Sequence, residues 1–445
     1  MNKFSPALAL VLLAAVPSCA SNRSGTSAQP LIAQEAAALN APERWAFGPE
    51  TDGDVAAGWS EIIKDDALLA LMDEALAANP SLRASAESVR RSEAFLRQSR
   101  SGLLPSLGAS AGVSGSSPFE DADLSESYSL GLSASWEADL WGAIRSGILA
   151  SEYDLVSTEA VYRSSRESLA AALSQATLSA QEETLRIVNV RYELGAADRR
   201  EQVLAESDIA SARDSLEQAL AAQRSAVRAL EVLLGRYPDG TLPMPDTLPV
   251  VTDVVIAGQP ADLLRRRPDI ISAESSVRSA FASTAIARAG RWPSLSLSGG
   301  VSSATDSLGD LVDPAALALS LGIRLAGTLF DGGLTTARID AAESNGRIAL
   351  ANYGATVLDA YADVEGRLDD VQTLRNRAGY VETAAENARE TLRLAEIQYR
   401  EGAIDLLDVL TFRQRSFQAD RTLLSLRRAQ IESRITLYLA LGGAI

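Results

Sequence analysis

The chain has 445 residues, with no histidine and a single cysteine, and its formal net charge is −17. Without histidine it cannot form a Ser-His-Asp triad, a Cys-His pair or a His-ligated zinc site. The negative charge argues against a nucleic-acid partner, because phosphate binding requires a basic surface. Apolar residues make up 47 % of the chain but aromatic residues only 5 %, which favours long helices with narrow apolar seams.

The first 18 residues have the pattern of a signal peptide. Lys3 is followed by an apolar run from Ala7 to Val16, which is too short to span a bilayer. Cys19 follows this run and resembles the lipidated, palmitate-bearing residue of a bacterial lipoprotein. The residues before it depart from the usual lipoprotein pattern, so an ordinary secretory signal with an incidental cysteine is the alternative. Residues 19–64 are expected to form a lipidated tether and an irregular segment.

Residues 65–234 contain a helical part followed by an alternating part. Apolar spacing predicts helices from Asp65 to the residue before Pro80 and from Ser81 to about Ser101. The period then changes to two at about 105–115 and again at about 128–138, which predicts strands. Each strand has one apolar face and one face composed mainly of serine and glycine.

Residues 263–445 repeat this order. A shift of 188 residues places Pro268 on Pro80, and it places the tripeptide Pro293-Ser294-Leu295 on Pro105-Ser106-Leu107. The second copy has a helix followed by alternating stretches at about 293–303 and 316–326. A proline-rich connector, residues 235–262, joins the copies. The chain is therefore predicted to be a tandem repeat of one unit.

The four alternating stretches are predicted to be transmembrane β-strands. Each has about ten residues, the length that a tilted strand needs to cross a bilayer, and a serine-glycine face suits a water-filled lumen. Two soluble hairpins packed on a core are the alternative. Open sheet edges are not tolerated in lipid, and four strands are too few to close a barrel. The barrel is therefore expected to be shared between several chains.

Long helices follow the second strand of each copy. They are predicted from Ala143 to about Leu194, from Arg199 to Leu234, from Thr335 to Tyr399, and from beyond Gly402 to Leu441. Their narrow apolar seams have coiled-coil spacing and are expected to serve packing. The fold class is thus mainly α with a β part, built on an internal two-fold sequence repeat.

Four motifs in this order resemble the TolC-like outer-membrane factors, in the OprM/NodT-like branch of efflux lipoproteins. The motifs are LLRRRPDIISAE at Leu263 to Glu274, ARAGRWPSLSL at Ala287 to Leu297, LFDGG at Leu329 to Gly333, and QYREGAIDLLDVL at Gln398 to Leu410. The resemblance covers the chain from about Ala67 to its C-terminus.

This resemblance implies a homotrimer in the cell outer membrane, with its helices extending into the periplasm. Three chains of four strands close a 12-stranded barrel, and long antiparallel helices continue it as an α-barrel tunnel. The channel serves as the passive exit duct of a tripartite multidrug efflux pump, together with a periplasmic adaptor protein and an inner-membrane pump. Neither a catalytic group nor a cofactor or metal is implied.

The resemblance also places a periplasmic gate at the helix turn after Tyr399. Asp408 matches an acid that lines the constriction in relatives, and Asp405 lies three residues before it on the same helix face. A solvated acid in a first helical turn is the alternative for both. Tyr399 and Glu201 match two partners of a latch that holds some relatives closed. Ile404 stands where that latch has an arginine, so the latch rests on Tyr399 and Glu201.

Aromatic and glycine residues gather where strands meet helices. Trp136, Trp141, Trp292 and Phe330 lie at strand ends, where an aromatic girdle at the membrane interface is expected. Gly332 and Gly333 follow Phe330 and are expected to allow the bend from strand to helix.

Other functions remain open at this point. The same architecture serves as the outer-membrane component of type I protein secretion. A lipid-anchored periplasmic coiled-coil adaptor is an alternative of a different class, although it would not need the four alternating strands. An enzyme is the weakest alternative, because the sequence has no nucleophile-base pair and no metal cluster.

Overall fold

The computed structural model describes residues 28–48, 65–116, 125–190, 199–245, 247–249 and 258–443. The signal peptide and Cys19 lie outside these residues, so both stay predictions. The chain divides into two compact units. The first unit comprises Met1–Ala36, Arg90–Ser157 and Ala273–Tyr353, and the second comprises Ala37–Val89, Thr158–Ser272 and Gly354–Ile445.

The N-terminal tether contains a helix that the sequence pattern does not predict. Helix α2 (Ala28–Ala38) is rich in alanine and has Pro30 in its first turn, where proline is tolerated. Ile32 is buried, and Arg278 Nη2 donates a hydrogen bond of 2.6 Å to Gln29 Oε1. The tether and irregular segment expected over residues 19–64 therefore include a packed helix at Ala28–Ala38.

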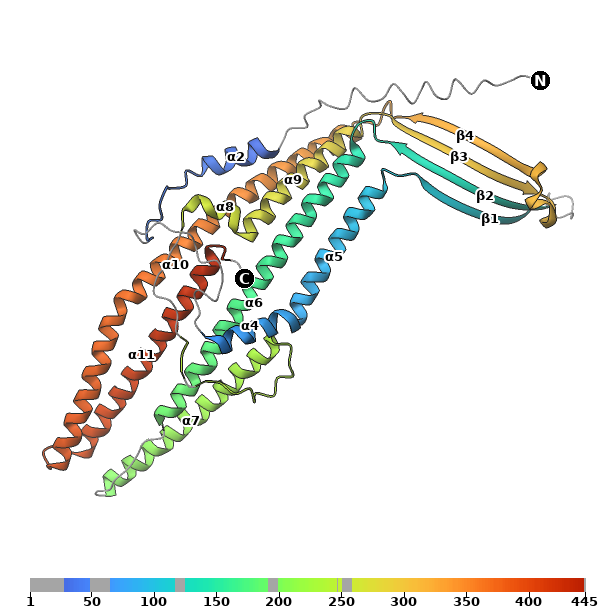
Figure 1. The fold of residues 1–445 in the computed structure, drawn as a ribbon. Coiled ribbons are helices and arrows are strands. Elements are labelled where there is room, and N and C mark those ends of the chain that lie inside the picture. Colours follow the sequence, from blue (N-terminus) through green and yellow to red (C-terminus); the bar gives the residue numbers. More distant parts are fainter. Residues whose placement is uncertain are drawn as a thin grey trace. The chain divides into compact units, whose positions relative to one another are not determined.

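The four predicted strands form one antiparallel sheet in the order β1-β2-β3-β4 (Figure 1). The strands are β1 (Ser106–Ser116), β2 (Ser125–Ala138), β3 (Ser294–Thr305) and β4 (Leu317–Ala326). The central pair joins the two sequence repeats, since β2 belongs to the first copy and β3 to the second. Among the described strands, the outer strands β1 and β4 each have one edge without a partner.

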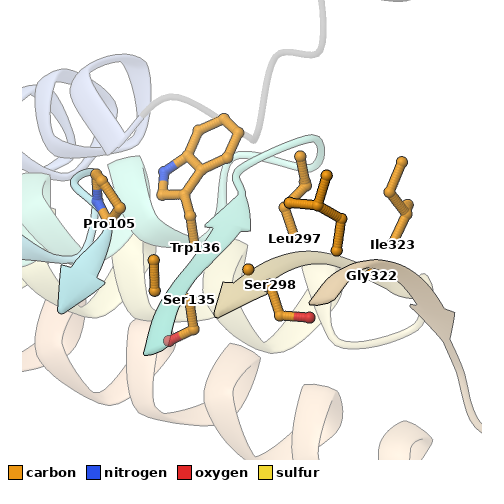
Figure 2. Close-up of a pocket in the computed structure, with 10 residues that line it drawn as sticks. Pro105, Ser135, Trp136, Leu297, Ser298, Gly322 and Ile323 are labelled. Atoms are coloured by element: carbon orange, nitrogen blue, oxygen red, sulfur yellow. The ribbon is translucent and has the colours of Figure 1, made fainter. Parts of the chain in front are cut away.

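The sheet has two chemically different faces. Figure 2 shows Trp136, Leu297 and Ile323 on one side of the ribbon and the hydroxyl groups of Ser135 and Ser298 on the other. On the polar face, glycine is repeatedly paired with serine on the neighbouring strand. A Cβ atom at Gly322 would lie 2.8 Å from Ser298 Oγ, which is too close. The serine-glycine alternation therefore lets the polar faces of adjacent strands fit together.

Helices make up most of the remaining chain. The long ones are α6 (Ala143–Val190), α7 (Arg199–Leu233), α10 (Leu334–Arg400) and α11 (Leu406–Ala440). The shorter elements are α4 (Asp66–Ala78), α5 (Pro80–Ser101), η1 (Pro260–Asp262), α8 (Leu263–Arg266), α9 (Pro268–Ala289), η2 (Leu308–Val312) and η3 (Pro314–Ala316). None of the helices in the described part of the chain combines the length and apolar composition needed to cross a membrane.

The core of the second unit lies where α4, α6, α7 and α11 meet. Leu68, Leu173, Leu230 and Ile435 are each at most 2 % exposed and belong to one apolar cluster. These side chains come from helices that carry narrow apolar seams between polar faces. The seams are thus used for packing, as their spacing predicts.

The LLRRRPD motif supplies an ionic hub in the second unit, centred on Arg267. Arg267 Nη1 donates to Asp363 Oδ2 at 3.1 Å and to the Ala440 carbonyl oxygen at 2.8 Å, while Nη2 donates to Asp269 Oδ2 at 2.8 Å. The side chain of Arg267 is only 14 % exposed. One guanidinium therefore ties the start of α9 to α10 and to the end of α11.

Glu167 on α6 lies close to this hub and should make stability depend on pH. Burial raises the pKa of its carboxyl group to about 7, and Asp269 adds to the rise, while Arg163, Arg166 and Arg267 oppose it. A raised carboxyl pKa means that the folded state holds its proton more tightly. The free energy of unfolding should therefore fall as pH rises from about 4.5 to about 7.

The substitution Glu167→Gln should remove this dependence. We expect the melting temperature of wild type, relative to that of the variant, to decrease between pH 5 and pH 8. A difference in melting temperature that stays constant over this range would show that Glu167 titrates normally.

Candidate functional site

Figure 1 shows a short turn joining α10 to α11. Gly402 lies in this turn, between the end of α10 at Arg400 and the start of α11 at Leu406. Gly402 has φ of +72°, a left-handed conformation that costs other residues energy. Its N–H donates to the Tyr399 carbonyl at 2.9 Å, and the Ala403 N–H donates to the Gln398 carbonyl at 2.8 Å. This pair of bonds is a Schellman motif, which ends a helix by satisfying its last carbonyl groups.

Asp405 is the N-cap of α11. Its Oδ1 accepts a hydrogen bond of 3.0 Å from the backbone N–H of Asp408. The structure thus brings the two predicted gate acids together, and both are exposed. Asp405 also has the capping role that is the alternative to a gate. Thr411, three residues after Asp408, donates its hydroxyl to the Leu407 carbonyl of its own helix.

The two predicted latch residues lie on different helices. Tyr399 is half-buried near the end of α10, and Ile404 is half-buried in the turn. Glu201 lies in the first turn of α7, and its side chain is outside the described residues. The latch therefore stays a prediction.

Ion pairs that no sequence motif predicts join the helices next to the turn. Arg413 Nη2 on α11 lies 3.3 Å from Glu396 Oε1 on α10, and Arg389 on α10 pairs with Asp420 on α11. Partly exposed ion pairs of this kind contribute little to the free energy of folding. Their main effect is to align α10 with α11.

A more buried ion pair joins α6 to α11. Glu182 has a side chain only 3 % exposed, and its Oε2 accepts from Arg428 Nη1 at 2.7 Å. Ser425 Oγ donates to Glu182 Oε1 at 3.0 Å, and Arg428 also contacts Glu432 on its own helix. This contact links the first sequence copy to the second. No local pattern indicates it, because its partners are 246 positions apart.

In the first unit, tryptophans cluster where strands meet helices. The rings of Trp141 and Trp292 stack with centroids 5.1 Å apart and an interplanar angle of 24°. Trp141 Nε1 donates to the Pro293 carbonyl at 2.8 Å, and Trp136 Nε1 donates to the Leu103 carbonyl at 2.9 Å. The apolar bodies of Trp136 and Trp141 remain partly exposed. Tryptophans with a satisfied N–H and an exposed ring suit a membrane interface.

The bend after β4 is made by glycine and capped by an aspartate. Gly332 and Gly333 have φ of +66° and +93°. Asp331 accepts from the Thr335 hydroxyl and from the backbone N–H groups of Thr335 and Gly333. The hydrogen bonds from Thr335 hold the pKa of Asp331 below its usual value. Phe330 precedes this cap and is 90 % exposed.

No cluster of acidic, cysteine or histidine residues that could hold a metal ion occurs in the part of the chain that the structure describes. The features that stand out are instead a two-faced sheet, long polar helices and an acidic helix turn. A family model described as outer membrane efflux protein matches residues 71–181 and 260–443. The chain is a member of the outer membrane efflux protein family.

Relatives match the chain over nearly its whole length. The pyoverdine export outer membrane protein OpmQ of Pseudomonas aeruginosa is 30 % identical, over 91 % of this chain and 91 % of OpmQ. The cation efflux system protein CusC of Escherichia coli is 29 % identical, over 87 % of this chain and 88 % of CusC. The open state of the MtrE outer membrane channel of Neisseria gonorrhoeae has a TM-score of 0.81 at 26 % identity, covering 91 % of this chain and 96 % of MtrE.

These similarities confirm the family and the fold class that the four motifs indicated. The chain is an outer-membrane efflux component with a mainly helical fold and one four-stranded sheet.

Proposed function

We propose that three copies of the chain form one outer-membrane channel that serves as the exit duct of a tripartite efflux pump for small molecules. Each copy contributes β1 to β4 to a closed 12-stranded barrel, and the long helices continue the duct into the periplasm. A periplasmic adaptor and an inner-membrane pump dock on the helices and supply the energy. The channel performs no reaction, so it needs neither a cofactor nor a metal ion.

The observation that carries this proposal is the two-faced sheet with two open edges. Leu321 is 83 % exposed and Ile323 is 73 % exposed on a face without polar side chains at its centre. Such a face suits lipid, whereas unpaired strand edges do not. Pairing β4 of one copy with β1 of the next removes every edge.

Small molecules are favoured over polypeptides by the names of the relatives. OpmQ is named for pyoverdine export, CusC for cation efflux, and SrpC of Pseudomonas putida for solvent efflux. Polypeptide secretion remains the alternative substrate class. Export assays of dyes and of a secreted polypeptide in a strain lacking its own channels would separate the two.

The aromatic residues Trp136, Trp141, Trp292 and Phe330 form the girdle at the periplasmic surface of the membrane in this proposal. Their support is the stacked, partly exposed indole pair and the exposed ring of Phe330. Gly332 and Gly333 have the separate role of turning the chain from strand into helix.

The gate lies at the α10–α11 turn, where three copies of Asp405 and of Asp408 form acidic rings around the axis. Closely spaced carboxylates attract cations and repel anions. Asp408→Asn should therefore lower the cation-to-anion permeability ratio by about two- to fivefold. The ratio is obtained from reversal potentials of the purified protein in planar bilayers under a salt gradient.

Asp405 needs a variant that separates charge from capping. Asp405→Asn removes the charge but keeps a good N-cap, whereas Asp405→Ala also removes the cap, at a cost of about 1 kcal/mol. A change in ion selectivity that both variants share therefore reports the lost charge and not the lost cap. Asp66→Asn is a matched control, because Asp66 is an exposed acid in the first turn of α4. Unchanged selectivity in both asparagine variants would contradict the gate. If folded, inserted wild-type protein carries no channel current, the adaptor alternative is favoured.

The latch is the second part of the gate proposal. Tyr399 on α10 and Glu201 on α7 hold the two helix pairs together in the closed state. Removing both, as Tyr399→Phe and Glu201→Gln, should raise the mean conductance and open probability of the channel. Conductance equal to that of wild type in the double variant would show that no latch connects these residues.

A further inference from the structure

The polar face of the sheet carries two charged side chains. The described strands contain three charged residues, namely Glu126 and Glu137 on β2 and Arg324 on β4. Glu126 alternates with the apolar residues and lies on the face of Tyr128, whose hydroxyl donates to it at 2.6 Å. Glu137 and Arg324 alternate with serine and glycine instead. The other residues on the polar face are small and uncharged.

These two charges lie in one row across the sheet. Glu137 is the register partner of Ser296 on β3, and Ser296 is the partner of Arg324. Two strand spacings separate the charged residues, which is about 9.6 Å between their backbones. The residue between them is small, so no bulky side chain screens one charge from the other.

Both charged groups are exposed, and no ion pair between them occurs among the described contacts. The next acid along the chain, Asp139, is already engaged. Its carboxylate contacts Arg145 Nε at 2.9 Å and caps α6 by accepting from the Ile144 N–H. Glu137 and Arg324 therefore present a carboxylate and a guanidinium to the solvent on the same face, at the end of the sheet that joins the helices.

The strand order converts this row into a ring. Charged strands (β2 and β4) alternate with uncharged ones (β1 and β3). When β4 of one copy pairs with β1 of the next, one uncharged strand again separates Arg324 from the following Glu137. With strands tilted by about 40°, acidic and basic residues differ in height by roughly 6 Å. Each charge is then flanked by opposite charges on both sides.

We propose that Glu137 and Arg324 form a ring of six alternating charges in the lumen, and that this ring binds solutes carrying both an acidic and a basic group. This inference rests on the proposed function, because it requires the shared barrel. Arginine binds carboxylates through two parallel hydrogen bonds, and a free carboxylate pairs with ammonium groups. A solute with two opposite charges about 10 Å apart bridges neighbouring members of the ring.

The ring is tested by ion selectivity, because removing its basic or its acidic residues should shift the cation-to-anion permeability ratio in opposite directions. In planar bilayers, Arg324→Gln leaves three acids and should raise the cation-to-anion permeability ratio about two- to threefold. Glu137→Gln should lower it by a similar factor, and the double variant should return close to wild type. Glu126→Gln is the matched control, since it removes the same charge from the same strand on the opposite face and should change nothing.

Triglycine tests the binding of a zwitterion directly. Its two charged ends are about 10 Å apart when it is extended. It should reduce the wild-type current in a concentration-dependent manner and lose at least most of this effect on the double variant Glu137→Gln/Arg324→Gln. Equal block of both proteins would overturn the binding role, even if selectivity changes as expected.

The outcomes separate this inference from the function on which it rests. If folded, inserted wild-type protein gives no channels, the proposed function fails. If wild type conducts and none of the single variants alters selectivity or block, the ring alone is wrong. Each variant is first checked for assembly by its migration as an unheated oligomer on gels, so that misfolding is not read as loss of binding.

Discussion

Replacing Leu321 by arginine should remove the protein from the outer membrane. Leu321 lies in the middle of β4, faces Gly299 across the sheet and is 83 % exposed on the apolar face. An arginine on the lipid face near the bilayer midplane costs about 2–4 kcal/mol. Three copies in one barrel raise this to roughly 6–12 kcal/mol. We expect at least a tenfold loss of assembled protein, measured by immunoblot of isolated outer membranes.

Ser320→Arg provides the matched control for this experiment. Ser320 is the preceding residue of the same strand, and its side chain belongs to the serine-glycine face. An arginine there enters a water-filled lumen and should assemble at close to the wild-type amount. If both variants are lost equally, the sheet is buried on both faces. If both assemble, neither face meets lipid.

Replacing Arg428 by methionine should strongly destabilise the helical part of the protein. The change removes the guanidinium that pairs with the carboxylate of Glu182, whose side chain is only 3 % exposed. Breaking a buried ion pair by removing one partner costs about 3–5 kcal/mol. Methionine preserves much of the apolar stem, so the loss reports the charge and not the packing. The unfolding midpoint in denaturant should fall accordingly.

Two further variants make this result specific. The double variant Glu182→Leu/Arg428→Met should recover most of the loss, because it removes the buried carboxylate as well. Arg393→Met breaks an exposed ion pair with Glu390 on α10 and should leave the midpoint unchanged. An equal decrease for Arg428→Met and Arg393→Met would mean that the buried pair contributes no more than a surface contact.

The sheet was predictable because its signal is local. A period of two over ten residues determines which side chains share a face, so the bounds of β1 to β4 agree with the sequence prediction within a few residues. The long helices were equally accessible through their seams and the interruption at Gly402. Helix α2 was missed because small and polar residues describe a tether as well as a helix whose packing partner lies far away in the chain.

The site was predictable only in part, for the same reason. Asp405 and Asp408 have the spacing of a helix cap, and the sequence alone therefore allowed both of their roles. The Glu182–Arg428 pair and the row from Glu137 to Arg324 depend on tertiary packing and strand register. No sequence motif indicates the ion pair or the charged row, since each joins residues from the two different sequence copies.

The most direct test of the shared channel is the native mass of the protein extracted from outer membranes in detergent. A shared 12-stranded barrel requires a single species with three times the mass of one mature chain, stable without any partner protein. A folded species with the mass of one chain would contradict it, because one sheet of four strands cannot close, and its edges would then lie unpaired in the membrane.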